Sequence, residues 1–270
     1  MRGDWTRLPE DVRAGITERT GPVRRVRAAP SGSNAAFAAT VTGAAGAAFV
    51  KAAPKTAPDQ DGAQVRALRR EALIAPCVPE FAPRLLCTAE AGGWLAVGFE
   101  VVNGRHADYS PGSPDLETLA KAIHHLQGTP CPAPVEMRVE RRWESLVPDA
   151  SPMAGDAFLH TDLNPHNILI EADDRAYVVD WGFASRGAPW VEIAQVVPWL
   201  LHAGHTPADA ERWAARFPSW AGAAPAAIDL HAHASAERWR RRAAADPNAA
   251  PAANLAVAQQ WANHRTSRAL

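Results

Sequence analysis

The spacing of apolar residues predicts a β-rich first part of the chain. Short apolar runs alternate with turns there, which is typical of strands. One helix interrupts them at residues 62–76, because its apolar residues recur every three or four positions as far as Pro76. The predicted strands are "VRRVRAA" at residues 23–29, a hairpin of "AAFAATVT" and "GAAFVKAA", and two strands in "RLLCTAEAGGWLAVGFEVV" that join at Gly92 and Gly93.

Beyond residue 103 the pattern becomes mainly helical. "DLETLAKAIHHLQG" starts at Asp115 and ends at Gly128, and an acid at the start and a glycine at the end are typical of a helix. We predict a second helix in "VEMRVERRWESLV" and two short strands in "NILIE" and "AYVVD". Further helices are predicted in "WVEIAQVVPWLLHAG", "TPADAERWAARF", "AAIDLHAHASAERWRRRAAA" and "NLAVAQQWANHR". The chain is therefore predicted to have an α+β fold.

Composition narrows the class of protein. A chain of 270 residues with 47% hydrophobic residues can bury a core in one large domain or two lobes. The formal net charge of −1 predicts neither a nucleic-acid nor a membrane partner, and no apolar run reaches the length of a membrane span. The charged start "MRGDWTRLPEDVRAG" is unlike a secretory signal. The three cysteines, Cys77, Cys87 and Cys131, lack paired spacing, so we expect reduced thiols in a cytoplasmic protein.

Two carboxylates and an amide lie close together in the sequence, beside the predicted strand pair. "FLHTDLNPHNILIE" contains Asp162 and Asn167, and "VVDWG" contains Asp180. Pairing of the two short strands would bring Asn167 and Asp180 together. Mg²⁺ prefers oxygen ligands of this kind, and a carboxylate beside the metal can orient a hydroxyl and accept its proton. The pattern favours phosphoryl transfer, with Asp162 as the base or orienting group and Asn167 and Asp180 as metal ligands.

These segments resemble the catalytic and metal-binding segments of the aminoglycoside phosphotransferase family, which are relatives of the protein kinases. The family pattern is H-x-D-x-x-x-x-N followed by an acid in a D-x-G-like element, and it is filled by His160, Asp162, Asn167, Asp180 and Gly182. The resemblance covers roughly residues 20–205. The last sixty or so residues match only in being helical.

The resemblance implies a bilobal protein-kinase-like fold and a reaction. Residues 1–103 would form a nucleotide-binding lobe, and residues 104–270 a mainly helical catalytic and substrate-binding lobe. The cofactors would be ATP, with GTP as an alternative, and Mg²⁺. The γ-phosphoryl group would pass to a hydroxyl of a small molecule such as an antibiotic, a sugar or a nucleoside-like metabolite.

The same resemblance predicts nucleotide contacts upstream. A strand lysine should grip the phosphates and pair with a helix glutamate, and Lys51 and Glu71 fill these places. Lys55 follows Pro54 and suits a strand interior less well. The loop that covers the phosphates is predicted at "SGSN", which is Ser31, Gly32, Ser33 and Asn34. The backbone near Glu100 and Val102 would contact the purine.

Structural alternatives exist for several of these residues. His160 is expected to support the catalytic loop by hydrogen bonds rather than to act as the base. "RWRRR", residues 238–242, suggests an anion-binding patch, although a charged helix face explains such a run more often. Asn164 and His166 receive no role. Lys51, Glu71 and "SGSN" have the alternatives of a strand-end charge, a surface charge and a plain turn.

Two other functions compete with the small-molecule phosphotransferase. A peptide or protein kinase is disfavoured, because no A-P-E-like element follows "DWGFASRGAPWVEIA". A regulatory protein that binds nucleotide without transfer would not need Asp162, Asn167 and Asp180 together. From Trp190 onward the sequence contains eight arginines and six acidic residues. This lack of an acidic excess disfavours a polycationic acceptor. The oligomeric state stays open.

Overall fold

The computed structural model describes residues 4–29, 35–78, 80–246 and 249–268, and it confirms the predicted α+β fold. The chain divides into two compact units. The first unit contains Met1–Arg105 and Leu169–Phe183, and the second contains His106–Ile168 and Ala184–Leu270. The first unit therefore ends two residues beyond position 103 and takes in a segment that follows much later in the sequence.

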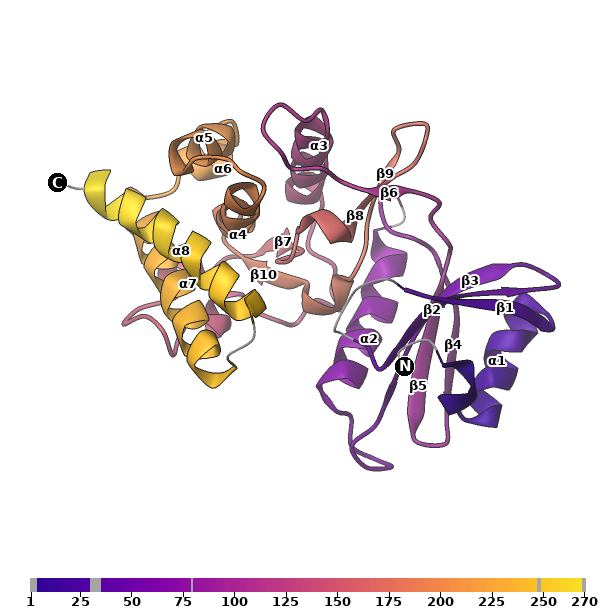
Figure 1. Ribbon diagram of the computed structural model, residues 1–270. Helices are drawn as coiled ribbons and strands as arrows, with labels where there is room; N and C mark the ends of the chain where they lie inside the picture. The colour runs from indigo at the N-terminus through magenta and orange to yellow at the C-terminus, as the bar shows by residue number, and fades with distance from the viewer. Residues whose placement is uncertain (1–3, 30–34, 79, 247–248, 269–270) are drawn as a thin grey trace. The chain divides into compact units, whose positions relative to one another are not determined.

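A five-stranded antiparallel sheet forms the centre of the first unit (Figure 1). Every strand predicted in this part of the sequence is present, including the hairpin. Hydrophobic side chains alternate between the two faces of the sheet, as expected for strands that are covered on both sides. In spatial order the strands are β1 (Val23–Ala28), β2 (Phe37–Gly43), β3 (Ala47–Pro54), β5 (Trp94–Phe99) and β4 (Leu85–Ala91).

Helices α1 (Glu10–Thr20) and α2 (Ala63–Ile74) cover opposite faces of this sheet (Figure 1). Neighbouring residues of a strand point to opposite faces, so β3 contributes to both cores. Val50 packs in the core of α1 with Ile16, whereas Ala53 packs in the core of α2 with Leu68. The face of α2 is also the face of Lys51, two residues before Ala53.

Helix α1 lies in a region that we predicted to consist mainly of strands. Pro9 precedes it, and Glu10 and Asp11 in its first turn suit the positive end of the helix dipole. Only Val12, Ile16 and Thr20 are buried, at intervals of four residues. The apolar stripe is too narrow to stand out in the sequence, and packing against the sheet stabilises the helix.

The predicted strands "NILIE" and "AYVVD" are present as β8 (Ile168–Ile170) and β9 (Ala176–Val178). They belong to a small sheet of order β6-β8-β9, in which β6 is Arg105–His106. The backbone N–H of Glu171 donates to the carbonyl oxygen of Arg175 at 2.9 Å and closes the turn. Asp174 in this turn has a φ of 64°, a conformation that aspartate tolerates better than most residues.

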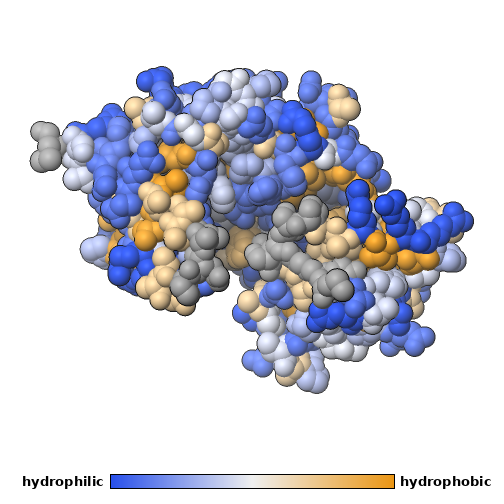
Figure 2. Space-filling model, in the orientation of Figure 1, coloured by the Kyte–Doolittle hydropathy of each residue, from blue (hydrophilic) through white to orange (hydrophobic). Residues whose placement is uncertain are grey.

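The second unit is mainly helical, with one pair of antiparallel strands, β7 (Ala157–Leu159) and β10 (Ser185–Gly187). Its helices are α3 (Asp115–Gly128), α4 (Trp190–His202), α5 (Pro207–Ala214), α6 (Pro218–Ala221), α7 (Pro225–Ala245) and α8 (Ala249–Arg268). Helices α7 and α8 lie side by side, and hydrophobic and hydrophilic side chains mix on their visible face (Figures 1 and 2). No helix in the described residues combines the length and apolar character that a membrane crossing requires.

The prediction of a helix in "VEMRVERRWESLV" is wrong. Only a 3-10 turn, η3 (Glu140–Arg142), forms there. The backbone before it pairs with β10: the N–H of Arg186 donates to Met137 O at 2.7 Å, and the N–H of Val139 donates to Arg186 O at 2.9 Å. These bonds satisfy backbone groups that a helix would have used internally, so a tertiary contact overrides the local pattern.

Candidate active site

Lys51 is held by two carboxylates inside the first unit. Its Nζ lies 2.8 Å from Oε1 and 3.1 Å from Oε2 of Glu71, and it also donates to Oδ1 of Asp180. The side chains come from β3, α2 and the segment after β9. Lys51 is only 8% exposed and Glu71 only 5%, so neither is a surface charge. The structure thus brings together three of the predicted site residues.

The charges of this group stabilise one another. Burial alone would lower the pKa of Lys51, but the carboxylates of Glu71 and Asp180 outweigh burial and raise it above its ordinary value. Burial raises the pKa of Glu71, and the Lys51 ammonium opposes that shift. Lys51 is therefore a fixed ammonium group, which is the chemistry that binds phosphate oxygens as a point charge.

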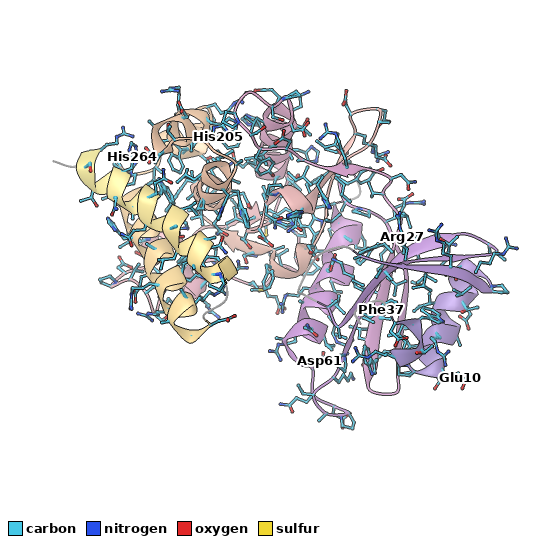
Figure 3. The ribbon with its side chains drawn as sticks, viewed as in Figure 1. Glu10, Arg27, Phe37, Asp61, His205 and His264 are labelled. Atoms are coloured by element: carbon cyan, nitrogen blue, oxygen red, sulfur yellow. The ribbon has the colours of Figure 1, made fainter. Side chains whose placement is uncertain are left out.

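Lys55 occupies a different environment at the end of β3. Its Nζ lies 2.5 Å from Oε1 of Glu90 and 4.0 Å from Oδ1 of Asp61. Arg69 of α2 joins both carboxylates, with Nε 2.6 Å from Oδ2 of Asp61, which is labelled in Figure 3. This surface network connects the sheet to α2 and leaves Lys51 as the lysine of the candidate site.

The backbone around Asp180 is locked in an uncommon conformation. Asp180 has a φ of 67°, in the left-handed region that non-glycine residues rarely adopt. The indole N–H of Trp181 donates to Val178 O at 2.9 Å, and Arg70 Nε donates to Gly182 O at 2.8 Å. A Cβ on Gly182 would lie 3.1 Å from that of Ala67 in α2, which explains the glycine. The helix that carries Glu71 thus also positions the Asp180 segment.

The predicted purine connector lies directly after β5. The backbone N–H of Glu100 donates to Arg84 O at 2.8 Å. The amide of Val102 makes no backbone hydrogen bond with another residue in the part of the chain that the structure describes. That the backbone at Glu100 and Val102 contacts the purine stays a prediction. Ser31, Gly32, Ser33 and Asn34 of the predicted phosphate loop lie outside the described residues.

Asp162 sits in the second unit in a loop built around its own carboxylate. Asn167 Nδ2 donates to Asp162 O at 2.9 Å and to Asp162 Oδ2 at 3.1 Å. Asn164 Nδ2 donates to Asp162 Oδ1 at 3.1 Å, which gives Asn164 the role that its sequence position did not reveal. Two amides from one short loop therefore fix the orientation of a partly exposed carboxylate.

Glu192 of α4 holds this loop by hydrogen bonds to its backbone, and the sequence analysis did not predict this role. Its Oε2 accepts from the backbone N–H of His160 at 2.5 Å, and its Oε1 accepts from the N–H of Thr161 at 2.9 Å. Thr161, next to Asp162, has a φ of 67°. Burial raises the pKa of Glu192 to about 7, although the backbone N–H groups of Thr161 and His160 oppose the shift. An acid within the apolar run "WVEIAQVV" was the available signal.

Three further side chains support the loop. His160 is fully buried, and its Nδ1 lies 3.3 Å from the backbone N of Asp162, in line with its expected supporting role. Arg142 Nη1 donates to Thr161 Oγ1 at 2.7 Å. The Tyr109 hydroxyl donates to Leu163 O at 3.2 Å, and His205, labelled in Figure 3, lies with Nε2 2.9 Å from Tyr109 O.

The oxygens that remain on Asn167 and Asp180 fit Mg²⁺. Asn167 uses its amide nitrogen to bind Asp162, and its Oδ1 accepts no hydrogen bond from a described residue. Asp180 uses Oδ1 for Lys51, and its Oδ2 is likewise without a partner among the described residues. One carboxylate and one amide oxygen are hard ligands of the type that Mg²⁺ takes together with phosphate and water. The two residues lie in different units, so a shared metal stays a prediction.

A pocket of about 670 Å³ opens elsewhere in the second unit, between α5 and α8, where His264 is labelled in Figure 3. None of the predicted site residues lines it. The lining residues are Ala208, Glu211, Arg212, Ala215, Trp220, Ala221, Ala223, Pro225, Ile228, Asp229, His264, Arg265 and Arg268. The pocket therefore does not contribute to the candidate active site.

Comparison with known proteins supports the predicted resemblance to the aminoglycoside phosphotransferase family. The model of the phosphotransferase enzyme family (APH) matches residues 111–231, which include the Asp162 loop and Asp180. A search of curated protein sequences found no match.

Solved structures match nearly the whole chain. Aminoglycoside phosphotransferase APH(4)-Ia is 14% identical, with a TM-score of 0.67 over 96% of this chain and 99% of that one. Choline kinase LicA from Streptococcus pneumoniae is 12% identical, with a TM-score of 0.57 over 94% and 95%. Spectinomycin phosphotransferase APH(9)-Ia, in complex with ADP and spectinomycin, is 9% identical, with a TM-score of 0.58 over 93% and 92%. The chain therefore has the protein-kinase-like fold, and its predicted resemblance to the aminoglycoside phosphotransferase family is confirmed.

Proposed function

We propose that this protein is an ATP-dependent phosphotransferase that moves the γ-phosphoryl group to a hydroxyl of a small molecule. The observation that carries the proposal is the buried contact of Lys51 with Glu71 and Asp180. A fixed ammonium beside a carboxylate with a free oxygen suits nucleotide phosphates and their metal. ADP in the similar APH(9)-Ia complex supports the use of a nucleotide.

Each residue has a distinct role in the proposed reaction. Lys51 holds the phosphates of the nucleotide, and Glu71 holds Lys51. Asp162 accepts a hydrogen bond from the acceptor hydroxyl. Asn164 and Asn167 keep its carboxylate oriented for this role. The acceptor oxygen bonds to the γ-phosphorus while the bond from phosphorus to the β,γ-bridging oxygen breaks. ADP leaves with that electron pair, and the hydroxyl proton passes to Asp162.

Asn167 and Asp180 would hold Mg²⁺ through their remaining oxygens. When bound, the metal would neutralise the negative charge of the phosphates. The backbone near Glu100 and Val102 would bind the purine, and Ser31 to Asn34 would cover the phosphates. The loose transition state makes alignment of the acceptor the main task of Asp162.

The test is a screen for ATP consumption over hydroxylated metabolites and antibiotics, with Mg²⁺ and with a chelator. We expect at least one acceptor to stimulate metal-dependent consumption and the variant Asp162→Ala to lose that stimulation. Nucleotide binding without acceptor-dependent consumption would instead favour a regulatory kinase-like protein. Phosphorylation of peptides but of no small molecule would favour a peptide kinase.

A further inference from the structure

The structure divides the arginine run of α7 into two groups. Arg240 and Arg241 pair with Glu237 on the exposed side of the helix, at 2.6 Å and 2.7 Å. Arg238 and Arg242 lie over indole rings instead, with Cζ 5.3 Å from the ring centre of Trp143 and 4.9 Å from that of Trp239, respectively. Neither makes an ion pair with a residue that the structure describes.

The other charges of the C-terminal segment are already used within the chain. Six of the eight arginines after Trp190 pair with carboxylates, which leaves Arg238 and Arg242. Five of the six acids are also engaged: Glu192 with backbone N–H groups, and Asp209, Glu211, Asp229 and Glu237 with arginines. Among the described residues of this segment, Arg238 and Arg242 are therefore the arginines that are left without a carboxylate partner.

Arg238 is placed beside the Asp162 loop. The ring under it, Trp143, directly follows Arg142, and Arg142 donates to Thr161 Oγ1 at 2.7 Å. Burial lowers the pKa of Arg238 to about 10, Arg242 lowers it as well, and the carboxylate of Asp162 opposes both effects. The indole ring under Arg238 thus connects it along the chain to the arginine that holds Thr161, next to Asp162, and all of these residues lie in the same unit.

Two neighbouring guanidinium groups without carboxylate partners are electrostatically unfavourable in the protein without a ligand. Like charges four residues apart on a helix repel one another, and partial burial removes part of the hydration of Arg238. Stacking on tryptophan offsets some of this cost and fixes the planar fork of donors. An oxyanion placed against the fork would remove the repulsion and accept two parallel hydrogen bonds.

We propose that Arg238, with Arg242 as a second cation, binds an oxyanion carried by the acceptor, so that the substrate is an anionic alcohol. A hydroxy acid and an alcohol that already bears a phosphate ester share this chemistry. The proposal rests on the proposed function, because it places the hydroxyl of the same molecule at Asp162. It predicts rejection of polycationic aminoglycosides, since the guanidinium groups of Arg238 and Arg242 would repel their ammonium groups.

The test compares related alcohols that carry a negative, a neutral or a positive group. One set is glycerate, glycerol 3-phosphate, glycerol and 3-amino-1,2-propanediol, and a larger set is gluconate, glucose 6-phosphate, glucose and glucosamine. Binding is measured by calorimetry in the presence of ADP, and transfer is measured with labelled ATP. We expect an anionic member of one set to bind about tenfold or more tightly than its neutral partner. The carboxylate and phosphate arms show which oxyanion is recognised.

Two variants of α7 make the assignment specific. Arg238→Gln should abolish the preference for the anion, raise KM for the anionic acceptor and leave ADP binding unchanged. Arg238→Lys should keep part of the preference, because it keeps the charge but loses the planar fork. Arg240→Gln is the matched control on the same helix. It should leave the preference for the anion and the KM unchanged, since Arg240 forms an ion pair with Glu237.

The outcomes separate this proposal from the proposed function. Anion binding that depends on Arg238 without any phosphoryl transfer would uphold the oxyanion site and reject the phosphotransferase. Transfer to neutral or cationic acceptors that Arg238→Gln leaves unchanged would do the reverse. Failure of every anionic member to bind, or equal losses for all members in Arg238→Gln, would overturn the oxyanion site.

Discussion

The ammonium of Lys51 lies 2.8 Å from Oε1 of Glu71, and both side chains are buried. We expect Lys51→Ala to reduce ATP turnover by roughly 10²-fold or more, because a fixed phosphate ligand is lost. Lys55→Ala should reduce it far less, since Lys55 belongs to a surface network with Glu90 and Asp61. Steady-state kinetics and calorimetry with an ATP analogue measure the difference.

Stability is the control for these two variants. Lys51→Ala leaves Glu71 buried without its cation, and removal of one partner of a buried pair costs about 3–5 kcal/mol. Lys51→Arg keeps the charge and serves as a second variant, with a geometry that differs at the phosphates. Equal losses of ATP use in folded Lys51→Ala and Lys55→Ala would show that the wrong lysine was chosen.

Asp162→Asn should separate binding from turnover. The carboxylate is partly exposed and oriented by Asn164 and Asn167, so its loss removes the group that aligns the hydroxyl. We expect turnover to fall by about 10² or more while nucleotide binding stays nearly intact. Calorimetry with an ATP analogue and a turnover assay on the identified acceptor check both halves. Near wild-type turnover would make Asp162 a structural residue.

Asp180→Asn should abolish turnover supported by Mg²⁺ while the fold stays intact. The variant keeps the shape of the side chain but removes the negative charge that would hold the metal. Activity is followed over a titration of Mg²⁺, with thermal unfolding as the measure of folding. Asp173→Asn, in the turn between β8 and β9, is the matched control, because the hydrogen bond that the structure describes for this carboxylate comes from the N–H of Arg175 in the same turn. Normal activity of Asp180→Asn would end the metal assignment.

Glu192 should make stability depend on pH in a direction opposite to that of a paired surface acid. Its pKa is about 7 in the folded protein against an ordinary value of 4.5, so the folded state binds more protons between these values. The contribution of Glu192 to the free energy of unfolding is therefore most favourable below pH 4.5 and falls as the pH rises toward 7. The total fall is about 3 kcal/mol.

Urea unfolding of wild type and Glu192→Gln at several pH values between 4 and 8 measures this dependence. The difference between the two proteins should change across that range, because only the wild type titrates at this position. Parallel stability curves would contradict the prediction. Turnover of Glu192→Gln should also fall. The NH₂ group of glutamine cannot accept a hydrogen bond, so one of the two bonds to the N–H groups of His160 and Thr161 is lost and the loop is held less firmly.

Arg265 should be a stability residue without effect on the site. It is 8% exposed, and its Nη1 lies 3.1 Å from Oε2 of the buried Glu211, while its Nε lies 2.5 Å from Oδ1 of Asp229. Arg265→Ala should lower the free energy of unfolding by about 3–5 kcal/mol. Arg268→Ala removes an exposed partner of the same glutamate and should cost less than about 1 kcal/mol. Equal costs in denaturant titrations would refute this ranking.

Local patterns in the sequence determined much of the fold. Short apolar runs between turns predicted all five strands of the large sheet, and Asp115 and Gly128 predicted both ends of α3. The spacing of Asp162 and Asn167 is also local, so the sequence alone placed them on one loop, where the amide of Asn167 contacts Asp162. Lys51 and Glu71 were predicted as a pair through the family resemblance, and they are in contact.

Contacts between distant segments decided the rest. Residues 137–139 do not form the predicted helix because their backbone pairs with Arg186 of β10, and nothing in their own sequence signals that partner. Glu192 reaches His160 and Thr161 from another helix, and the arginines of α7 divide according to whether Glu237 or a tryptophan is within reach. Hydrogen bonds, ion pairs and stacking depend on where the chain returns in space, and the tertiary structure alone determines that return.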